Sequence, residues 1–83
     1  MEKLLVSVYV VSLQQRFDIF IPTFLTMQEL AQLIVKGLVE MTNSRYEPSG
    51  SELLCLKDPP TLLHQKYTPE DFQLRNGDEL VLF

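Results

Sequence analysis

The chain has 83 residues, enough for one hydrophobic core, and we expect residues 1–83 to form a single domain. Its composition of 46% hydrophobic and 22% charged residues is ordinary for a globular protein and excludes a disordered chain. The net charge of −4 and the scattered positions of the seven basic residues argue against a nucleic-acid-binding protein, because a polyanion requires clustered Lys and Arg.

Two strands are expected at the start of the chain. The first covers residues 3–11, which are rich in Val and Tyr. The second covers residues 16–21 and ends at Pro22, because proline cannot donate to a strand ladder. The polar break between them is short enough for a hairpin.

The clearest signal is a helix over residues 27–41. Thr26 and Glu29 form a capping box, in which each side chain can accept the backbone N–H of the other residue. Beyond the cap, apolar residues recur at steps of three and four, namely Met27, Leu30, Ile34, Leu38 and Met41. Gly37 costs roughly 1 kcal/mol relative to alanine in mid-helix, so we interpret it as a sign of close packing or early fraying.

The remaining strands are short and lie between turn-forming residues. They are expected at residues 52–57, 62–63 and 79–83. Residues 67–74 are expected to form a turn or a short helix, because Thr68 followed by Pro69 is a helix-start pattern. Asn76-Gly77 supplies a tight turn before the last strand.

The expected order is therefore strand, strand, helix, strand, short strand, turn, strand. A hairpin crossed by one helix on one face, with later strands completing a mixed sheet of four or five strands, is the α+β architecture called the β-grasp. We expect the last strand to lie beside the first and parallel to it.

This order resembles ubiquitin over essentially the whole chain. The segments FDIFIPTFLTMQELAQLIVKGL and LRNGDELVLF resemble, more closely, the YukD/EsaB family of ubiquitin-like proteins. That family is associated with the type VII (WXG100) secretion systems of Gram-positive bacteria. The resemblance implies a cytosolic accessory or regulatory protein that binds a protein partner, such as a membrane-associated secretion component, and that has no catalytic activity.

A protein modifier or sulfur carrier is the alternative with the same fold. Such proteins need a flexible tail ending in Gly-Gly, because only glycine lets the backbone thread the channel of an adenylating enzyme. The sequence is expected to be strand up to Phe83 and has no Gly-Gly there. We therefore expect that this chain is not conjugated.

The expected location is the cytoplasm. The apolar run after Lys3 lacks the positively charged start and the cleavage site of a signal peptide. Cys55 is the single cysteine, which fits a reducing compartment. No stretch approaches the roughly 20 apolar residues of a membrane span, so we expect no direct membrane insertion.

Catalysis is not expected. Cys55 lies in an apolar strand without a basic neighbour in the sequence, as is typical of an inert small hydrophobe. His64 is the single histidine, whereas metal sites and catalytic triads need several partners at defined spacing. Glu70 and Asp71 fit the first turn of a helix, where they compensate its dipole. We expect no enzyme activity, no metal and no cofactor.

The helix can cover only one face of the sheet, and the pleat sends alternate side chains to the opposite face. If Ile21 pairs with Leu4, then Phe20 lies opposite Leu5. Leu53 or Cys55 adds to this face according to the register of the third strand. We predict that a protein partner binds an apolar surface formed by Leu5, Tyr9, Phe20, Cys55, Val81 and Phe83.

Two alternatives remain open for this apolar surface. Its side chains can be singly exposed, which is normal for proteins, rather than a contiguous patch. A homodimer through the same sheet face competes with a foreign partner.

Overall fold

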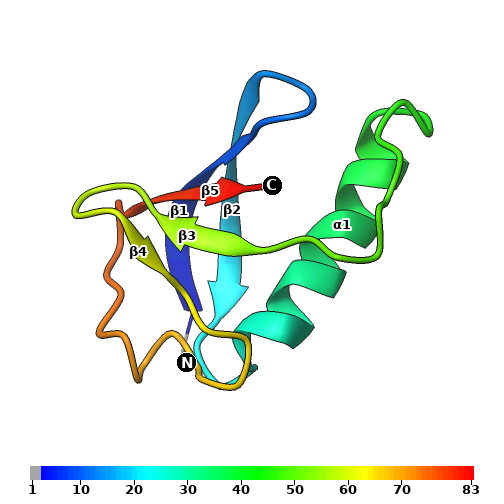
Figure 1. The fold of residues 1–83 in the computed structure, drawn as a ribbon. Helices are drawn as coiled ribbons and strands as arrows, with labels where there is room; N and C mark the ends of the chain where they lie inside the picture. The colour runs from blue at the N-terminus through cyan, green and yellow to red at the C-terminus, as the bar shows by residue number, and fades with distance from the viewer. Residues whose placement is uncertain (1–2) are drawn as a thin grey trace.

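The computed structural model describes residues 3–83. The elements follow the order β1 (Lys3–Val10), β2 (Gln15–Pro22), α1 (Met27–Met41), β3 (Leu54–Leu56), β4 (Thr61–Leu62) and β5 (Glu79–Leu82). The five strands form one sheet with the spatial order β2-β1-β5-β3-β4, and α1 lies against one side of it (Figure 1). Strand β5 runs parallel to β1, as expected, and the other pairs are antiparallel. This mixed sheet with one helix is a β-grasp.

The β1–β2 hairpin meets the condition under which Phe20 lies opposite Leu5. Leu4 pairs with Ile21, and Leu5 pairs with Phe20. The turn between the strands contains Gln14 at a φ of 53°, in the left-handed region. The hairpin register decides which residues of β1 and β2 face α1 and which face solvent.

Helix α1 has the predicted bounds, because both its ends are held by side chains. The Glu29 carboxylate accepts the N–H of Thr26 at 2.9 Å, and the Thr26 hydroxyl accepts the N–H of Glu29 at 3.2 Å. At the other end the Thr42 hydroxyl donates to the carbonyl of Leu38 at 2.7 Å. A Cβ added to Gly37 would meet nothing within 4 Å, so this glycine marks neither close packing nor an end of the helix.

The second half of the chain differs from the expectation in its boundaries. β3 has three residues, because Glu52 is drawn into the hydrogen bonds of the preceding loop. β4 lies one residue earlier than expected, at Thr61–Leu62. Of the turn and the short helix expected for residues 67–74, the structure has the turn, in which the Asp71 carboxylate accepts the N–H of Thr68 at 2.9 Å.

The core lies between α1 and the facing side of the sheet. The apolar stripe of the helix packs there against alternate residues of the strands, and Leu30 and Val8 are each 0% exposed. The partly buried Leu4, Phe17 and Ile19 pack against this core. No helix of residues 3–83 lies over the opposite side of the sheet, which is called here the outer face (Figure 1).

Leu30→Ala should lower the free energy of unfolding by about 2–5 kcal/mol, because it opens a cavity at a fully buried site. Leu33→Ala is a matched control in the same helix, since Leu33 is 51% exposed, and it should cost about 1 kcal/mol or less. Urea unfolding followed by circular dichroism measures both values. Equal losses in the two variants would contradict the placement of the core.

Candidate protein-binding surfaces

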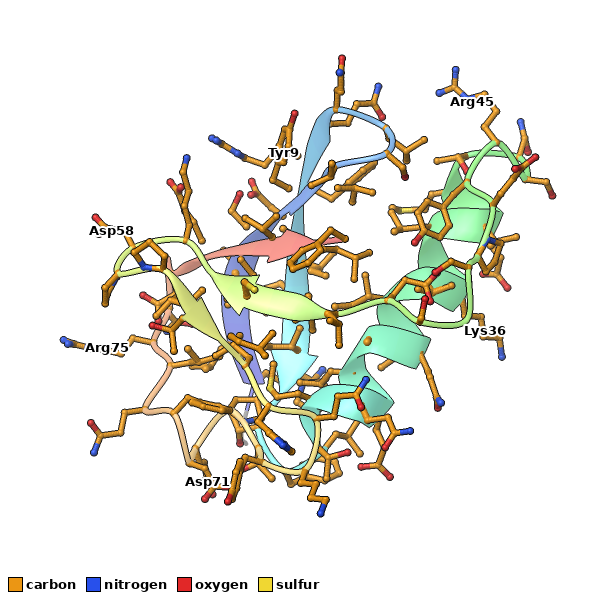
Figure 2. All side chains as sticks on the ribbon, in the orientation of Figure 1. Tyr9, Lys36, Arg45, Asp58, Asp71 and Arg75 are labelled. Carbon is orange, nitrogen blue, oxygen red and sulfur yellow. The ribbon has the colours of Figure 1, made fainter. Side chains whose placement is uncertain are left out.

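The pairing of the strands places four apolar side chains in a line across the outer face. Val81 on β5 pairs with Tyr9 on one side and with Cys55 on the other, and Cys55 pairs with Leu62. Directly paired residues point to the same side of a sheet. Tyr9 projects to the side of the sheet away from α1 (Figure 2). Tyr9, Val81, Cys55 and Leu62 are called here the outer apolar row.

Phe83 and Leu53 extend the outer apolar row at one side. The two residues exchange both backbone hydrogen bonds, at 2.7 and 3.0 Å, so the ladder between β3 and β5 continues by one pair. Leu53 and Cys55 are two residues apart and share a face, so the outer face receives both instead of one or the other. Phe83 is 54% exposed and Leu62 is 53% exposed. Sequence reasoning placed Leu62 in the fourth strand but did not assign it to a face of the sheet, so it was missing from the expected surface.

A polar row separates Leu5 and Phe20 from the outer apolar row. Ser7 on β1 pairs with Asp18 on β2 and with Glu79 on β5. The carboxylate of Glu79 lies 3.2 Å from the ammonium group of Lys57, which ends this polar row on the β3 side. The six residues expected to form one binding surface therefore all lie on the outer face, but in two groups.

The smaller group consists of Leu5 and Phe20, which pair directly across the hairpin. Phe20 is 67% exposed. The Leu5 main chain is held from the other side, where its N–H donates to Oδ1 of Asn76 at 2.8 Å and its carbonyl accepts the N–H of Gly77 at 2.8 Å. The Asn76-Gly77 turn thus anchors the start of β1 and leaves the Leu5–Phe20 pair facing solvent.

A second apolar surface lies between β2 and α1, where sequence reasoning placed only core. It is a groove of about 150 Å³ with an almost entirely apolar lining, called here the β2–α1 groove. Its strand side includes Phe17 and Ile19, and its helix side includes Leu33 and Met41. Leu33 lies beside the main apolar stripe of the helix, so an apolar residue at this flanking position is the signal that could have indicated the groove.

The groups considered for catalysis do not come together as a site. Cys55 is half-buried in the outer apolar row, between Val81 and Leu62. The Nδ1 atom of His64 accepts the N–H of Lys66 at 3.2 Å, and the His64 ring packs edge-on against Tyr67. Over residues 3–83, no three His, Cys, Asp or Glu side chains are grouped as a metal site would require. In the same range, no helix is long and apolar enough to cross a membrane.

Within residues 3–83, one pair of titratable groups has shifted pKa values, and it closes the loop between α1 and β3. The Tyr46 hydroxyl donates to Oε2 of Glu52 at 3.0 Å, and the N–H of Ser49 donates to the same oxygen at 2.8 Å. Burial and the adjacent Glu52 carboxylate raise the pKa of Tyr46 to about 12. Burial by itself raises the pKa of Glu52, but backbone N–H groups of the loop, with that of Ser49 first, and the Tyr46 hydroxyl together outweigh it, so this pKa lies below its usual value. The pair has a structural role, because it faces neither apolar surface.

The Glu52 carboxylate should make the stability of the fold depend on pH. Its folded pKa is lower than its unfolded pKa, so its contribution is present above the unfolded value of about 4.3 and is lost as the pH falls through the folded pKa. Glu52→Gln should therefore be less stable than wild type at pH 7, with a smaller difference at acid pH. Tyr46→Phe should cost about 1 kcal/mol at pH 7.

Urea unfolding at a series of pH values measures these effects. The double variant with both substitutions is the control, because Tyr46→Phe should cost less once the carboxylate is gone. An equal cost of Tyr46→Phe in both backgrounds would show that the hydroxyl and the carboxylate do not interact.

Comparison with known proteins identifies the fold. No protein-family model and no curated protein matches the sequence. The ubiquitin-like domain of an Arabidopsis thaliana protein matches the structure with a TM-score of 0.71 and 19% identity, over 100% of this chain and 78% of that chain. The ubiquitin-like domain of the Mycobacterium tuberculosis type VII secretion system protein EccD1 matches with a TM-score of 0.73 and 16% identity, over 99% of this chain and 98% of that chain.

A third match is a chain of the ESX-5 inner membrane complex, with a TM-score of 0.69 and 17% identity. It involves 100% of this chain and 21% of that much longer chain. At these low identities the likeness establishes the fold alone. The β-grasp of this chain is ubiquitin-like.

Proposed function

We propose that this chain, with its ubiquitin-like β-grasp fold, is a non-catalytic protein-interaction module that serves as a cytosolic accessory component of a type VII secretion system, in the manner of YukD/EsaB proteins. The observation that carries the proposal is the outer apolar row with its extension by Phe83 and Leu53. The likeness to EccD1 and to a chain of the ESX-5 inner membrane complex supports the assignment to secretion.

The outer apolar row suits a docking function because the sheet holds its side chains in place before a partner arrives. Four neighbouring strands contribute one residue each, and at a spacing of about 4.8 Å the row spans roughly 14 Å. Burial of apolar surface stabilises a complex by roughly 25 cal/mol per Å2, and pre-ordered side chains lose little entropy on binding. A partner of matching shape therefore has a rigid apolar strip to cover.

The polar row sets the orientation of such a partner. The Lys57–Glu79 ion pair and Asp18 border the strip on one side, and a partner that covers the strip must leave these charges in water or pair with them. The proposed partner is a membrane-associated component of the secretion system, which would bring this chain to the cytoplasmic side of the membrane without any insertion of its own.

Deletion of the gene in its native bacterium should reduce secretion of WXG100 substrates into the medium, and the wild-type gene should restore it. The double variant Leu62→Asp/Phe83→Asp should fail to restore secretion, because it places charges on the outer face. It should also weaken binding of the purified protein to the detergent-solubilised secretion complex by about tenfold or more.

Phe24→Asp is the matched control. Phe24 is 72% exposed, but it lies in the loop that connects β2 to α1 and is not part of the outer apolar row. It should restore secretion and bind as wild type does. Circular dichroism verifies that all variants fold. Unchanged secretion after deletion would overturn the role in secretion, and equal binding by the outer-face and control variants would overturn the role of the outer apolar row.

A further inference from the structure

The long edge of the sheet at β2 lies apart from the outer apolar row and is open. Within the described residues, β2 has β1 as its single neighbour, and the other edge of the sheet is β4. β4 has two residues and follows Pro59-Pro60, which is a common way to blunt an edge strand. β2 has eight residues, and the ladder to β1 is continuous over all of them, with a proline only at its last position. It therefore keeps a full template for pairing with another strand.

The hydrogen bonds of β1 show which of its main-chain groups point toward β5 and which point toward β2. The N–H of Leu5 donates to Asn76 and the N–H of Ser7 donates to the carbonyl of Asp78, so the odd-numbered residues of β1 face β5 with their main chain. The even-numbered residues, such as Val6 and Val8, must then bond to β2, since main-chain groups alternate in direction along a strand.

The same alternation places free main-chain groups at the open edge of β2. Val6 pairs with Ile19, and Val8 pairs with Phe17, so the N–H and carbonyl groups of Ile19 and Phe17 point toward β1. The N–H and carbonyl groups of Arg16, Asp18 and Phe20 therefore point away from the sheet. Their side chains lie on the outer face, whereas Phe17 and Ile19 point to the helix side, where the β2–α1 groove lies.

We propose that β2 pairs antiparallel with β2 of a second copy of this chain, which joins the two sheets and seats the second strand along the β2–α1 groove. Arg16 and Asp18 are two residues apart on the same edge and carry opposite charges. In a symmetric antiparallel pair centred on Phe17, Arg16 of each copy lies directly opposite Asp18 of the other. The edge is thus complementary to itself in charge, and Phe17 meets Phe17 of the second copy on the helix side.

Two neighbouring registers are less favourable, one because of charge and one because of Pro22. A pair centred on Asp18 places two carboxylates directly opposite each other, which is destabilising. A pair centred on Ile19 places Arg16 opposite Pro22, which has no N–H to donate. The register centred on Phe17 joins two attractive charge pairs to an aromatic contact, which favours it over the registers centred on Asp18 and Ile19.

Light scattering on a concentration series tests the dimer, first with wild type and then with variants in which the charges of Arg16 and Asp18 are reversed. Wild type should approach twice its 9.6 kDa mass as the concentration rises. Arg16→Asp and Asp18→Arg should each weaken the dimer by about tenfold or more, because each places like charges opposite one another. An equimolar mixture of the two variants should dimerise again, and so should the chain that carries both substitutions.

Asp18→Pro tests the main-chain contact. Its N–H points to the open edge, so the monomer should keep its fold by circular dichroism while the dimer is lost. A wild type that stays monomeric overturns the proposal. A dimer that survives Asp18→Pro, or single-charge variants that do not recover on mixing, also overturns it. A dimer that is lost in Phe83→Asp but not in Asp18→Pro assigns self-association to the outer face instead. None of these outcomes depends on whether the chain serves secretion.

Discussion

The insertion of β5 between β1 and β3 is the constraint on which the outer face depends. One side of β5 is held by the bond from the N–H of Ser7 to the carbonyl of Asp78, at 3.0 Å. The other side is held by the bond from the N–H of Lys57 to the carbonyl of Glu79, at 2.9 Å. Without β5, the hairpin and the β3–β4 pair have no common sheet. The outer apolar row exists because a residue of β5 bridges Tyr9 and Cys55.

Local sequence patterns predict the first half of this chain well, because the interactions there are local. The Thr26–Glu29 capping box sets the start of α1, and alternation of apolar residues sets the hairpin register. The second half is less predictable. Glu52 looks like part of a strand, but its carboxylate is engaged by Tyr46 and Ser49. Thr68 and Pro69 look like a helix start, and the turn that follows buries Pro69 instead.

The candidate surfaces were predictable as residue types but not as shapes. All six expected residues lie on the outer face, since strand periodicity alone assigns a face. Their division into two groups follows from the alignment of Ser7 with Asp18 and Glu79, which is a property of three strands together. The β2–α1 groove depends on how far α1 extends over the edge of β2, and no periodicity in the sequence encodes that distance.

The central position of β5 has a consequence for synthesis of the chain. Translation proceeds from the amino end, so β1 is made before β5, its neighbour in the middle of the sheet, and all the other described strands and α1 are made between them. Until β5 leaves the ribosome, the β1–β2 hairpin has unpaired main-chain groups on both edges, and part of its apolar face is exposed to solvent. Such a nascent chain is a substrate for chaperones and proteases. Messenger RNAs that are truncated before the codons of β5 should therefore yield products that are degraded. They should not yield smaller folded forms of the protein.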